Sequence, residues 1–472
     1  MISKRFYACA IAGFALCALY FLVSLQLCGW RVGAGLSWIN WIREWAKARQ
    51  AMTVVEALDA TQIFFGFCAL SVAYAALVFV AGRAAPIGPR SIFGLAAFVC
   101  TALVLSGRLQ STDIFDYLVR GRILAVHHQN PFLVPPQAIH NDPYLKLCHW
   151  PKIVWSYGPI WLLLVSAATA MPSPLGAALV IRAMMAMAHV ANGWMIWTIH
   201  ADAIPKKRAR LTALYLFCPL ALWEFAANGH CDAIAITFIL LGFLLDQRGR
   251  RAGAAAALMA AAMIKIYTGP ILLFYFLANV RKGSLTVRRS AAVEILWPAA
   301  LLTLIFYVPF VHTRAAIFAP FGGGGVNTVN WSWGEIPFIR HWIPSWLIVT
   351  LGLRITLLAI FGGCVEAWSH GDWREAGAWF LFLWSALGAT WFEPWYPTMA
   401  LATGLVAGRF RLRFSTVFLA MTAPASYFIG CVSYPEWVPT VAEALTPWAT
   451  VLPVLVCLAL ALRAFSENPP SA

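Results

Sequence analysis

Charged residues are scarce in this chain. Only 11% of its 472 residues are Asp, Glu, Lys or Arg, whereas 61% are hydrophobic. Because a soluble globular domain typically has about 25% charged residues, this composition excludes an ordinary soluble domain. Apolar stretches at 6–28, 64–81 and 290–311 each approach the roughly 20 residues that cross a bilayer, so the sequence predicts an all-α, polytopic transmembrane helical bundle.

Acidic residues are the rarer charged class, with 19 Asp and Glu against 34 Lys and Arg. In a soluble protein this excess would suggest nucleic acid as a partner. Here the basic residues lie in short loops between apolar stretches, which is the pattern of cytoplasmic loops in membrane proteins. The sequence therefore predicts the lipid bilayer as a partner and excludes nucleic-acid binding.

Nucleotide and metal motifs are also missing. No G-x-x-x-x-G-K-[ST] or G-x-G-x-x-G loop occurs in a strand-to-helix context, which excludes ATP and NAD chemistry. The 11 cysteines lie mostly in apolar stretches and show no metal-ligand spacing. Four cysteines lie near loops and could form disulfides: Cys28, Cys148, Cys231 and Cys431. No separate soluble domain, low-complexity segment or internal repeat is evident.

The basic loops also predict an orientation. The run Lys206 to Arg210 and the similar runs at 248–251, 281–289 and 409–413 are expected in the cytoplasm. An odd number of crossings must then separate the outer loop that begins at Arg108 from Lys206. Two apolar stretches lie between them, so we expect 155–171 to be a juxtamembrane or re-entrant helix and 175–199 to span the membrane.

The same count of membrane crossings places Lys265 at the outer tip of a short helical hairpin, and Pro270 begins the second helix of that hairpin. About 14 spans with both termini inside are predicted. We divide them into N-terminal spans at 1–90, a core at 91–290 with outer loop 108–174, and C-terminal spans at 291–472 with outer loops 313–344 and 391–397.

The polar clusters that suit chemistry all fall on the predicted outer side. The first loop holds Asp113, Asp116, Tyr117, Arg120, Arg122 and Asn130. The alternative is a solvated loop whose aspartates pair with its arginines. The second cluster holds Asn228, His230 and Asp232 between apolar spans, where an ionisable group is expensive unless it lines a wet cavity. The alternative there is a helix-capping role for Asp232.

Two further sites lie later in the chain. Lys265 stands alone between apolar runs and either extends to the interface or binds an anionic phosphate. Glu393, Trp395 and Tyr396 lie in the last outer loop. The aromatics suit an interfacial belt, and Glu393 is either a further acid of the site or a partner of Arg314 or Arg340.

Carboxylates, a lysine, arginines and aromatics at a membrane surface suit the transfer of a group from a lipid-phosphate donor. A carboxylate would deprotonate an acceptor hydroxyl, and cations would stabilise the departing phosphate. We expect Asp113, Asp232 and Lys265 to share one water-accessible pocket.

These residues carry a family resemblance. The segment TDIFDYLVRGRILAVHHQNPFLVPP, followed by Tyr157 to Pro159, is similar to the first outer loop of the GT-C superfamily of integral-membrane glycosyltransferases. It most closely resembles that of bacterial polyprenol-phosphate-mannose-dependent mannosyltransferases. NGHCDAIAITFILLGFLL with the downstream lysine resembles their N-G-H-N-D-A-L stretch, and EPWYPTMAL resembles their late P-W-Y motif.

The resemblance implies a function and roles for residues. It implies a GT-C-type bundle in a bacterial inner membrane, with Asp113 as catalytic base and Lys265 and Arg122 on the donor phosphate. The substrate-binding residues expected with them are Asp116, Tyr117, Arg120, Asn130, Tyr157, Asn228, His230, Asp232, Glu393, Trp395 and Tyr396. Thr112, Arg120 and Cys231 replace family Asp, Asp and Asn residues, which leaves the sugar and a possible divalent cation open.

The expected activity is inverting transfer of mannose or another hexose from a polyprenyl-phosphate donor to a hydroxyl of a glycan or glycolipid acceptor, facing the periplasm or cell exterior. Two alternatives stay open. A transporter or flippase of lipid-linked sugars would need no base, but the related halves typical of transporters are not visible. A glycan ligase or polymerase using a lipid diphosphate would depend on Arg120 and Arg122 rather than on Asp113.

Overall fold

The computed structural model describes residues 70–76, 88–105, 111, 113–322, 332–335, 337–424, 451–456 and 458–459. Regular structure in this part of the chain is entirely helical, which confirms the all-α prediction. The span predicted at 6–28 and most of the one at 64–81 lie outside the described residues, as do Cys28 and Cys431.

The helices group into two compact units, with α10 (Asp232–Gln247) and η5 (Thr303–Tyr307) passing from one to the other. The first unit holds the described residues up to Thr237 and those from Phe306 to Gly322. Its other elements are α4 (Pro89–Leu105), α5 (Asp113–Ala125), η1 (Pro136–Ala138), η2 (Leu145–Leu147), α6 (Pro159–Ala168), α7 (Pro174–Ile199), α8 (Pro205–Leu216), α9 (Pro219–Leu222), η3 (Trp223–Ala227), η6 (Val308–Phe310) and α14 (Arg314–Gly322).

The second unit holds Phe238–Ile305 and the described residues that follow Gly322. Its elements are α11 (Arg251–Ala262), η4 (Ile266–Thr268), α12 (Gly269–Val280), α13 (Leu285–Leu302), η7 (Trp333–Glu335), α15 (Pro337–Trp342), α16 (Ser345–Ser369), α17 (Trp373–Leu383), η8 (Trp384–Gly388), α18 (Pro397–Ala407) and α19 (Phe410–Thr422). Helices α14 and α15 therefore lie within the predicted outer loop 313–344.

Three helices among the described residues are long and apolar enough to cross a membrane: Pro174–Ile199, Leu285–Phe310 and Ser345–Ser369. A fourth is possible if α8 and the segment from α9 to η3 form one bent span. The predicted count of about 14 spans is thus not established, although the membrane character is. Helix α7 begins at a local signal, because Ser173 Oγ accepts the Gly176 N–H at 3.0 Å and Pro174 occupies the first turn.

The bent span leads to the second polar cluster, whose residues Asn228, His230 and Asp232 are fully buried. Its two parts meet at an angle of 50°. Pro219 follows the break, and a proline cannot donate the backbone hydrogen bond that would continue helix α8. The second part ends in the π-helical turn η3, and Asn228 to Cys231 then lead into α10. This path places the second polar cluster at the buried end of a broken helix.

Helix α6 occupies the first apolar stretch after the outer loop. It has 10 residues and is about 15 Å long, which is too short to cross the hydrocarbon core. This length agrees with the juxtamembrane or re-entrant helix that the charge count required. It packs closely on α5, since a Cβ on Gly121 would lie 2.9 Å from the carbonyl oxygen of Val165.

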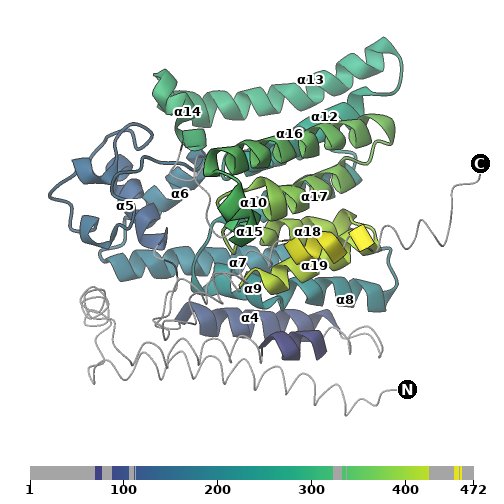
Figure 1. Cartoon of the computed structure of the whole chain (residues 1–472), viewed down its shortest axis with the longest axis horizontal. Helices are drawn as coiled ribbons and strands as arrows, with labels where there is room; N and C mark the ends of the chain where they lie inside the picture. Colours follow the sequence, from purple (N-terminus) through teal and green to yellow (C-terminus); the bar gives the residue numbers. More distant parts are fainter. Residues whose placement is uncertain are drawn as a thin grey trace, which may run out of the picture. The chain divides into compact units, whose positions relative to one another are not determined.

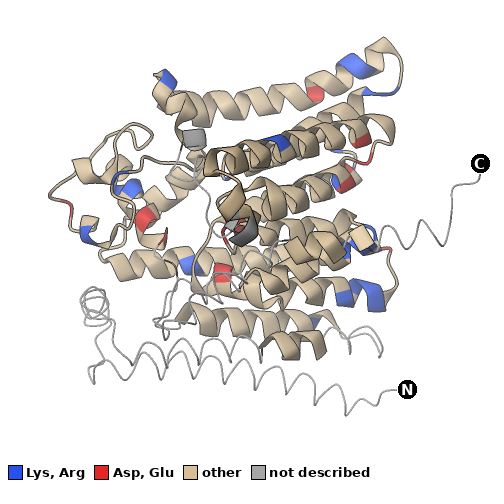
Figure 2. Cartoon of the chain, viewed as in Figure 1, with Lys and Arg blue, Asp and Glu red and all other residues tan. Residues whose placement is uncertain are grey.

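Charge is confined mainly to helix ends and loops. Figure 1 shows α4, α7 and α8 side by side in the first unit, as their packing contacts require. In Figure 2 the basic residues of α8 gather at its beginning. Helix α7 contains a single Lys or Arg, which is Arg182. Lys265 lies between α11 and α12, and these two short helices pack together as the predicted helical hairpin.

Candidate active site

Asp113 begins helix α5 and is partly buried. Its backbone N–H donates to Ser111 Oγ at 3.3 Å, and the Ser111 N–H donates to Asn228 Oδ1 at 3.4 Å. The first outer loop and the second polar cluster are therefore joined beside this carboxylate. A helix N-terminus favours a negative charge, so the position suits an ionised Asp113.

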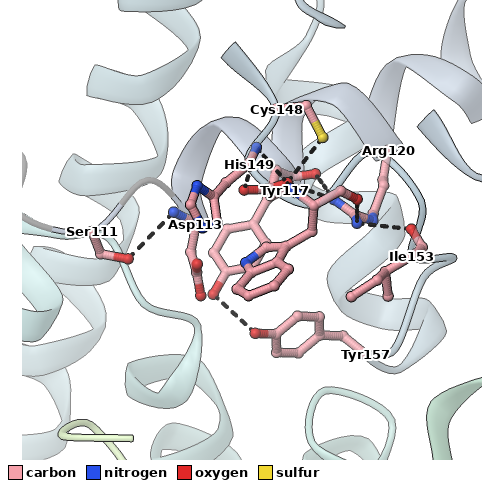
Figure 3. A network of polar contacts seen from close by, with 10 residues as sticks. Ser111, Asp113, Tyr117, Arg120, Cys148, His149, Ile153 and Tyr157 are labelled. Carbon is pink, nitrogen blue, oxygen red and sulfur yellow. Dashed lines mark hydrogen bonds and ion pairs between the residues drawn. The ribbon is translucent and has the colours of Figure 1, made fainter. Parts of the chain in front are cut away.

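Tyr117 lies one turn after Asp113 and connects three segments. Its hydroxyl is 3.3 Å from the Tyr157 hydroxyl and 3.3 Å from His230 Nδ1. Its ring is packed edge-on against Tyr157, Trp155 and Trp161. Figure 3 shows the side chains of Asp113, Tyr117 and Tyr157 pointing toward one another.

His230 is fixed by Glu224, an acid of η3. Both side chains are fully buried. Glu224 Oε2 lies 3.3 Å from His230 Nε2 and accepts from Asn228 Nδ2 at 3.1 Å, while the His230 N–H donates to the Glu224 carbonyl at 2.9 Å. Between them, Gly229 has φ +76°, and a Cβ there would lie 3.0 Å from Ile114 Cδ1, so the turn requires glycine.

Asp232 directly follows this turn as the first residue of α10 and is fully buried. The Cys231 carbonyl accepts the first amides of the helix, from Ile234 at 3.0 Å and Ala235 at 3.2 Å. Asp232 thus lies within the first helical turn, where the helix dipole offsets part of the cost of burying its charge.

Asp116 and Arg120 form a buried ion pair on the next turns of α5, with Arg120 Nη1 3.1 Å from Asp116 Oδ1. Asp116 also accepts the Cys148 thiol at 3.0 Å and the amides of His149 and Trp150 at 3.0–3.2 Å. Arg120 Nη2 donates to the Trp150 and Ile153 carbonyls at 2.9 and 2.8 Å. The pair holds loop 148–153 against α5. Asp116 thus pairs with an arginine of its own loop, as the alternative expected, but the pair is buried rather than solvated.

Arg122 and Asn130 hold other parts of the outer loop. Arg122 Nε donates to both oxygens of Asp142 at 3.0 and 2.9 Å, and its guanidinium lies 4.3 Å over the Tyr144 ring. His127 Nε2 lies 2.7 Å from Asp142 Oδ2. Asn130 Nδ2 donates to the Phe310 carbonyl at 2.6 Å, which joins the loop to η6.

Burial and neighbouring charge change the pKa of several groups in this loop. Burial, followed by the nearness of Tyr157 and Asp113, raises the pKa of the Tyr117 hydroxyl well above its ordinary value. Burial and Asp116 raise the pKa of the Cys148 thiol to about 12, so it remains a hydrogen-bond donor. Burial opposes ionisation of Asp142, but His127, the Tyr144 amide and Arg122 together hold its pKa below the ordinary value.

Lys265 belongs to the second unit and is almost fully buried. Its Nζ lies 5.8 Å from the centre of the Tyr267 ring and 5.9 Å from that of Tyr396. Tyr267 stacks on Trp384 with ring centres 3.9 Å apart, and Tyr396 packs on both. Lys265 thus lies within a group of aromatic faces, where a cation is stabilised.

The remaining predicted residues of the second unit are near Tyr396. Trp395 is buried against the Tyr396 ring. Glu393 Oε1 accepts from Trp391 Nε1 at 2.5 Å. The side chain of Arg340, one of its two suggested partners, lies outside the described residues.

The structure thus gathers Asp113, Tyr117, Tyr157, Asn228 and His230 in the first unit, with Asp232 adjoining. Lys265 and Tyr396 are gathered in the second unit. The single pocket expected for Asp113, Asp232 and Lys265 stays a prediction.

Sequence reasoning missed Asp142, which binds Arg122, and two buried charges within helices of the first unit, Glu224 and Arg182. Arg182 Nε donates to the Ala226 carbonyl at 3.2 Å and its Nη2 donates to the Leu103 carbonyl, which anchors the end of η3. Glu224 and Arg182 interrupt apolar stretches, the same signal that drew attention to Asp232.

No group of three or more His, Cys, Asp or Glu side chains is arranged to hold a metal ion in the described part of the chain. Cys148 and Cys231, two of the cysteines that could have formed disulfides, are buried and form none.

Comparison with known proteins identifies a family for this chain. A comparison with curated proteins finds no match. A family model described as "Alpha-(1->6)-mannopyranosyltransferase, N-terminal domain" matches residues 11–281, which include every predicted site residue from Asp113 to Lys265. Because this match covers more than half of the sequence and confirms the resemblance, the chain belongs to the alpha-(1->6)-mannopyranosyltransferase family, a membrane mannosyltransferase family of the GT-C type.

Proposed function

We propose that this protein transfers a mannosyl group from a polyprenyl-phosphate donor to an acceptor hydroxyl on the non-cytoplasmic side of the membrane, with inversion at the anomeric carbon. The observation that supports this most is the position of Asp113. It begins a helix, lies near the buried Tyr117 hydroxyl and is joined to the second polar cluster through Ser111 and Asn228.

Asp113 is the proposed general base. The acceptor oxygen forms a bond to the anomeric carbon while the bond from that carbon to the phosphate oxygen breaks, and its electron pair stays on the phosphate. The acceptor proton passes to Asp113. Attack opposite to the leaving phosphate inverts the configuration.

Lys265 is the proposed cation for the departing phosphate. A buried ammonium among aromatic faces is suited to an anionic oxygen, because the surroundings offer little water to screen the charge. Arg122 is already bound to Asp142, so we assign the phosphate to Lys265 first. Tyr157, Asn228, His230 and Asp232 are proposed to position the sugar or acceptor, and Asp116, Arg120 and Asn130 to hold the loops around them.

The test is Asp113→Asn, assayed in detergent with radiolabelled polyprenyl-phosphate mannose and an alkyl α-mannoside as acceptor. We expect turnover to fall by about a hundredfold to ten-thousandfold, the usual contribution of a general base. Binding of the donor should be largely retained, because the substituted amide has nearly the same shape.

Asp202→Asn is the matched control, since Asp202 is an exposed carboxylate in the turn after α7. It should leave turnover unchanged. Near-normal turnover of the Asp113 variant would remove the proposed mechanism. Absence of any labelled product from the wild-type protein would instead favour a transporter, which moves the lipid-linked sugar without transferring it.

A further inference from the structure

Three aromatic side chains cluster where the end of α7 meets the start of α4. The centre of the Phe93 ring lies 5.4 Å from that of Trp194 and 6.3 Å from that of Trp197. Trp194 is 55% exposed, and Ile204, in the turn before α8, is 69% exposed. At 1.5 Å per residue, Trp194 lies about 18 Å along α7 from Arg182, so this apolar surface is separate from the candidate active site.

Basic residues lie next to the aromatic cluster. They come from the beginnings of two helices, α4 and α8, and are Arg90, Lys206, Lys207, Arg208 and Arg210. Arg208 is fixed against the cluster, because its Nε donates to the Trp197 carbonyl at 2.7 Å and its guanidinium lies 4.2 Å from the centre of the Trp197 ring. Arg90 is exposed and lies about one turn before Phe93 on α4. We call these five cations, with Phe93, Trp194 and Trp197, the basic–aromatic patch.

The cations of the patch have little negative charge near them. The described ion pairs of the first unit lie in the outer loop and at Glu224, and none includes a cation of the patch. The turn between α7 and α8 contains one carboxylate, that of Asp202. Exposed Lys206 and Arg210 are four positions apart on α8 and repel each other, and the helix dipole also disfavours cations in the first turn. The described chain by itself therefore leaves this positive charge uncompensated.

The combination of cations and exposed aromatic surface fits an anionic amphiphile. Lysine and arginine at a membrane surface are attracted to anionic headgroups, and tryptophan is favoured at the level of the headgroups. We propose that the basic–aromatic patch binds an anionic phospholipid of the leaflet that it faces. The headgroup phosphate contacts the cations at the start of α8, and the acyl chains lie against Phe93 and Trp194. The proposal does not depend on the reaction at Asp113.

The test measures how phospholipids stabilise the purified full chain in detergent. A ligand that binds the folded protein alone raises its thermal midpoint as the ligand concentration rises. We expect phosphatidylglycerol to raise the midpoint more than phosphatidylcholine with the same acyl chains, because phosphatidylglycerol carries a net negative charge. High salt should reduce the difference, since the patch is exposed. Equal stabilisation by the two lipids would overturn the proposal.

A matched pair of variants locates the site. Lys206→Ala with Lys207→Ala removes two cations of the patch, whereas Lys146→Ala with Lys152→Ala removes two exposed lysines of the outer loop. We expect the apparent dissociation constant for phosphatidylglycerol to rise about 30-fold in the first variant, since each lysine near an anionic lipid surface contributes about fivefold. The second variant should match the wild type.

The first variant should stay folded without lipid, because alanine favours a helix and the substitutions remove charges that oppose the helix dipole. The same phosphatidylglycerol affinity in the wild type and both variants would show that the lipid binds elsewhere, and would overturn the site.

Two further measurements identify the ligand as a lipid. Soluble glycerol phosphate has the phosphate but no acyl chains, so it should not stabilise the protein at the same concentration. Stabilisation equal to that by phosphatidylglycerol would mean a site for a soluble anion and would overturn the lipid. Trp194→Ala should weaken phosphatidylglycerol binding, whereas Trp342→Ala, at an exposed tryptophan of α15, should not. Unchanged binding in Trp194→Ala would overturn the placement of the acyl chains.

Discussion

Asp113 and Asp116 lie one turn apart on α5 but have different surroundings. Asp116 is enclosed by Arg120, the Cys148 thiol and two backbone amides. Removing one member of a buried ion pair typically costs about 3–5 kcal/mol, because the other charge stays buried. Asp116 is thus bound to structural partners, whereas Asp113 lies at the helix start beside the Tyr117 hydroxyl.

Asp142 provides a prediction about pH. Its folded-state pKa lies below the ordinary value of 3.8. An acid with a depressed folded pKa contributes its full stability above the unfolded value and loses it as pH falls through the folded value. We therefore expect loop 139–148 to be protected at neutral pH and to loosen as the pH drops below 3.8. Hydrogen exchange of peptides from this loop, corrected for the intrinsic pH dependence, measures the change.

Asp142→Asn should increase exchange in this loop at neutral pH already, because the amide binds Arg122 more weakly. Asp202→Asn is again the control. Protection that stays constant in wild-type protein below pH 3.8 would show that Asp142 does not stabilise the loop.

Helix packing depends on small residues at particular positions. On α16, a Cβ on Gly363 would lie 2.4–2.8 Å from the Phe274 ring of α12, whereas one on Gly362 would meet nothing within 4 Å. Phe274 is fully buried and has little room to move. The two adjacent glycines therefore form a matched pair for testing this packing.

Gly363→Ala should destabilise the protein. Overpacking a buried contact typically costs about 1–3 kcal/mol, which outweighs the gain of about 1 kcal/mol from replacing a helical glycine by alanine. Gly362→Ala gains the same propensity without the clash and should be neutral or stabilising. Thermal midpoints in detergent measure both, and a stabilising Gly363→Ala would contradict the packing of α12 on α16.

At the scale of the whole molecule, the basic loops predict that the outer loop 108–174 faces away from the cytoplasm. A cysteine that replaces exposed His140 should react with an impermeant thiol reagent applied to intact cells. One that replaces exposed Lys206 should react only after the membrane is permeabilised. The unsubstituted protein gives the background from native thiols. The reverse pattern would overturn the predicted orientation, and with it the proposed side of transfer.

Local features were predictable from the sequence. Three predicted features involve residues close together in the chain: the hairpin around Lys265, the short helix after the outer loop, and the pairing of a first-loop aspartate with an arginine, seen in Asp116 and Arg120. Longer-range partners were not predictable. Arg122 meets Asp142, and Tyr117 meets His230, 113 positions away, only because α5, its loop and the broken helix are packed together.

The sequence by itself determined that this is a helical membrane protein with carboxylates and a lysine between its apolar segments, since hydropathy and charge are properties of each segment alone. It also determined the family, through motifs that are contiguous in the chain. Only the tertiary structure decided that Glu224 stands behind His230 and that Arg182 anchors η3. An acid or a base within an apolar stretch reveals that its charge needs a partner, but which partner it meets depends on how separate helices pack.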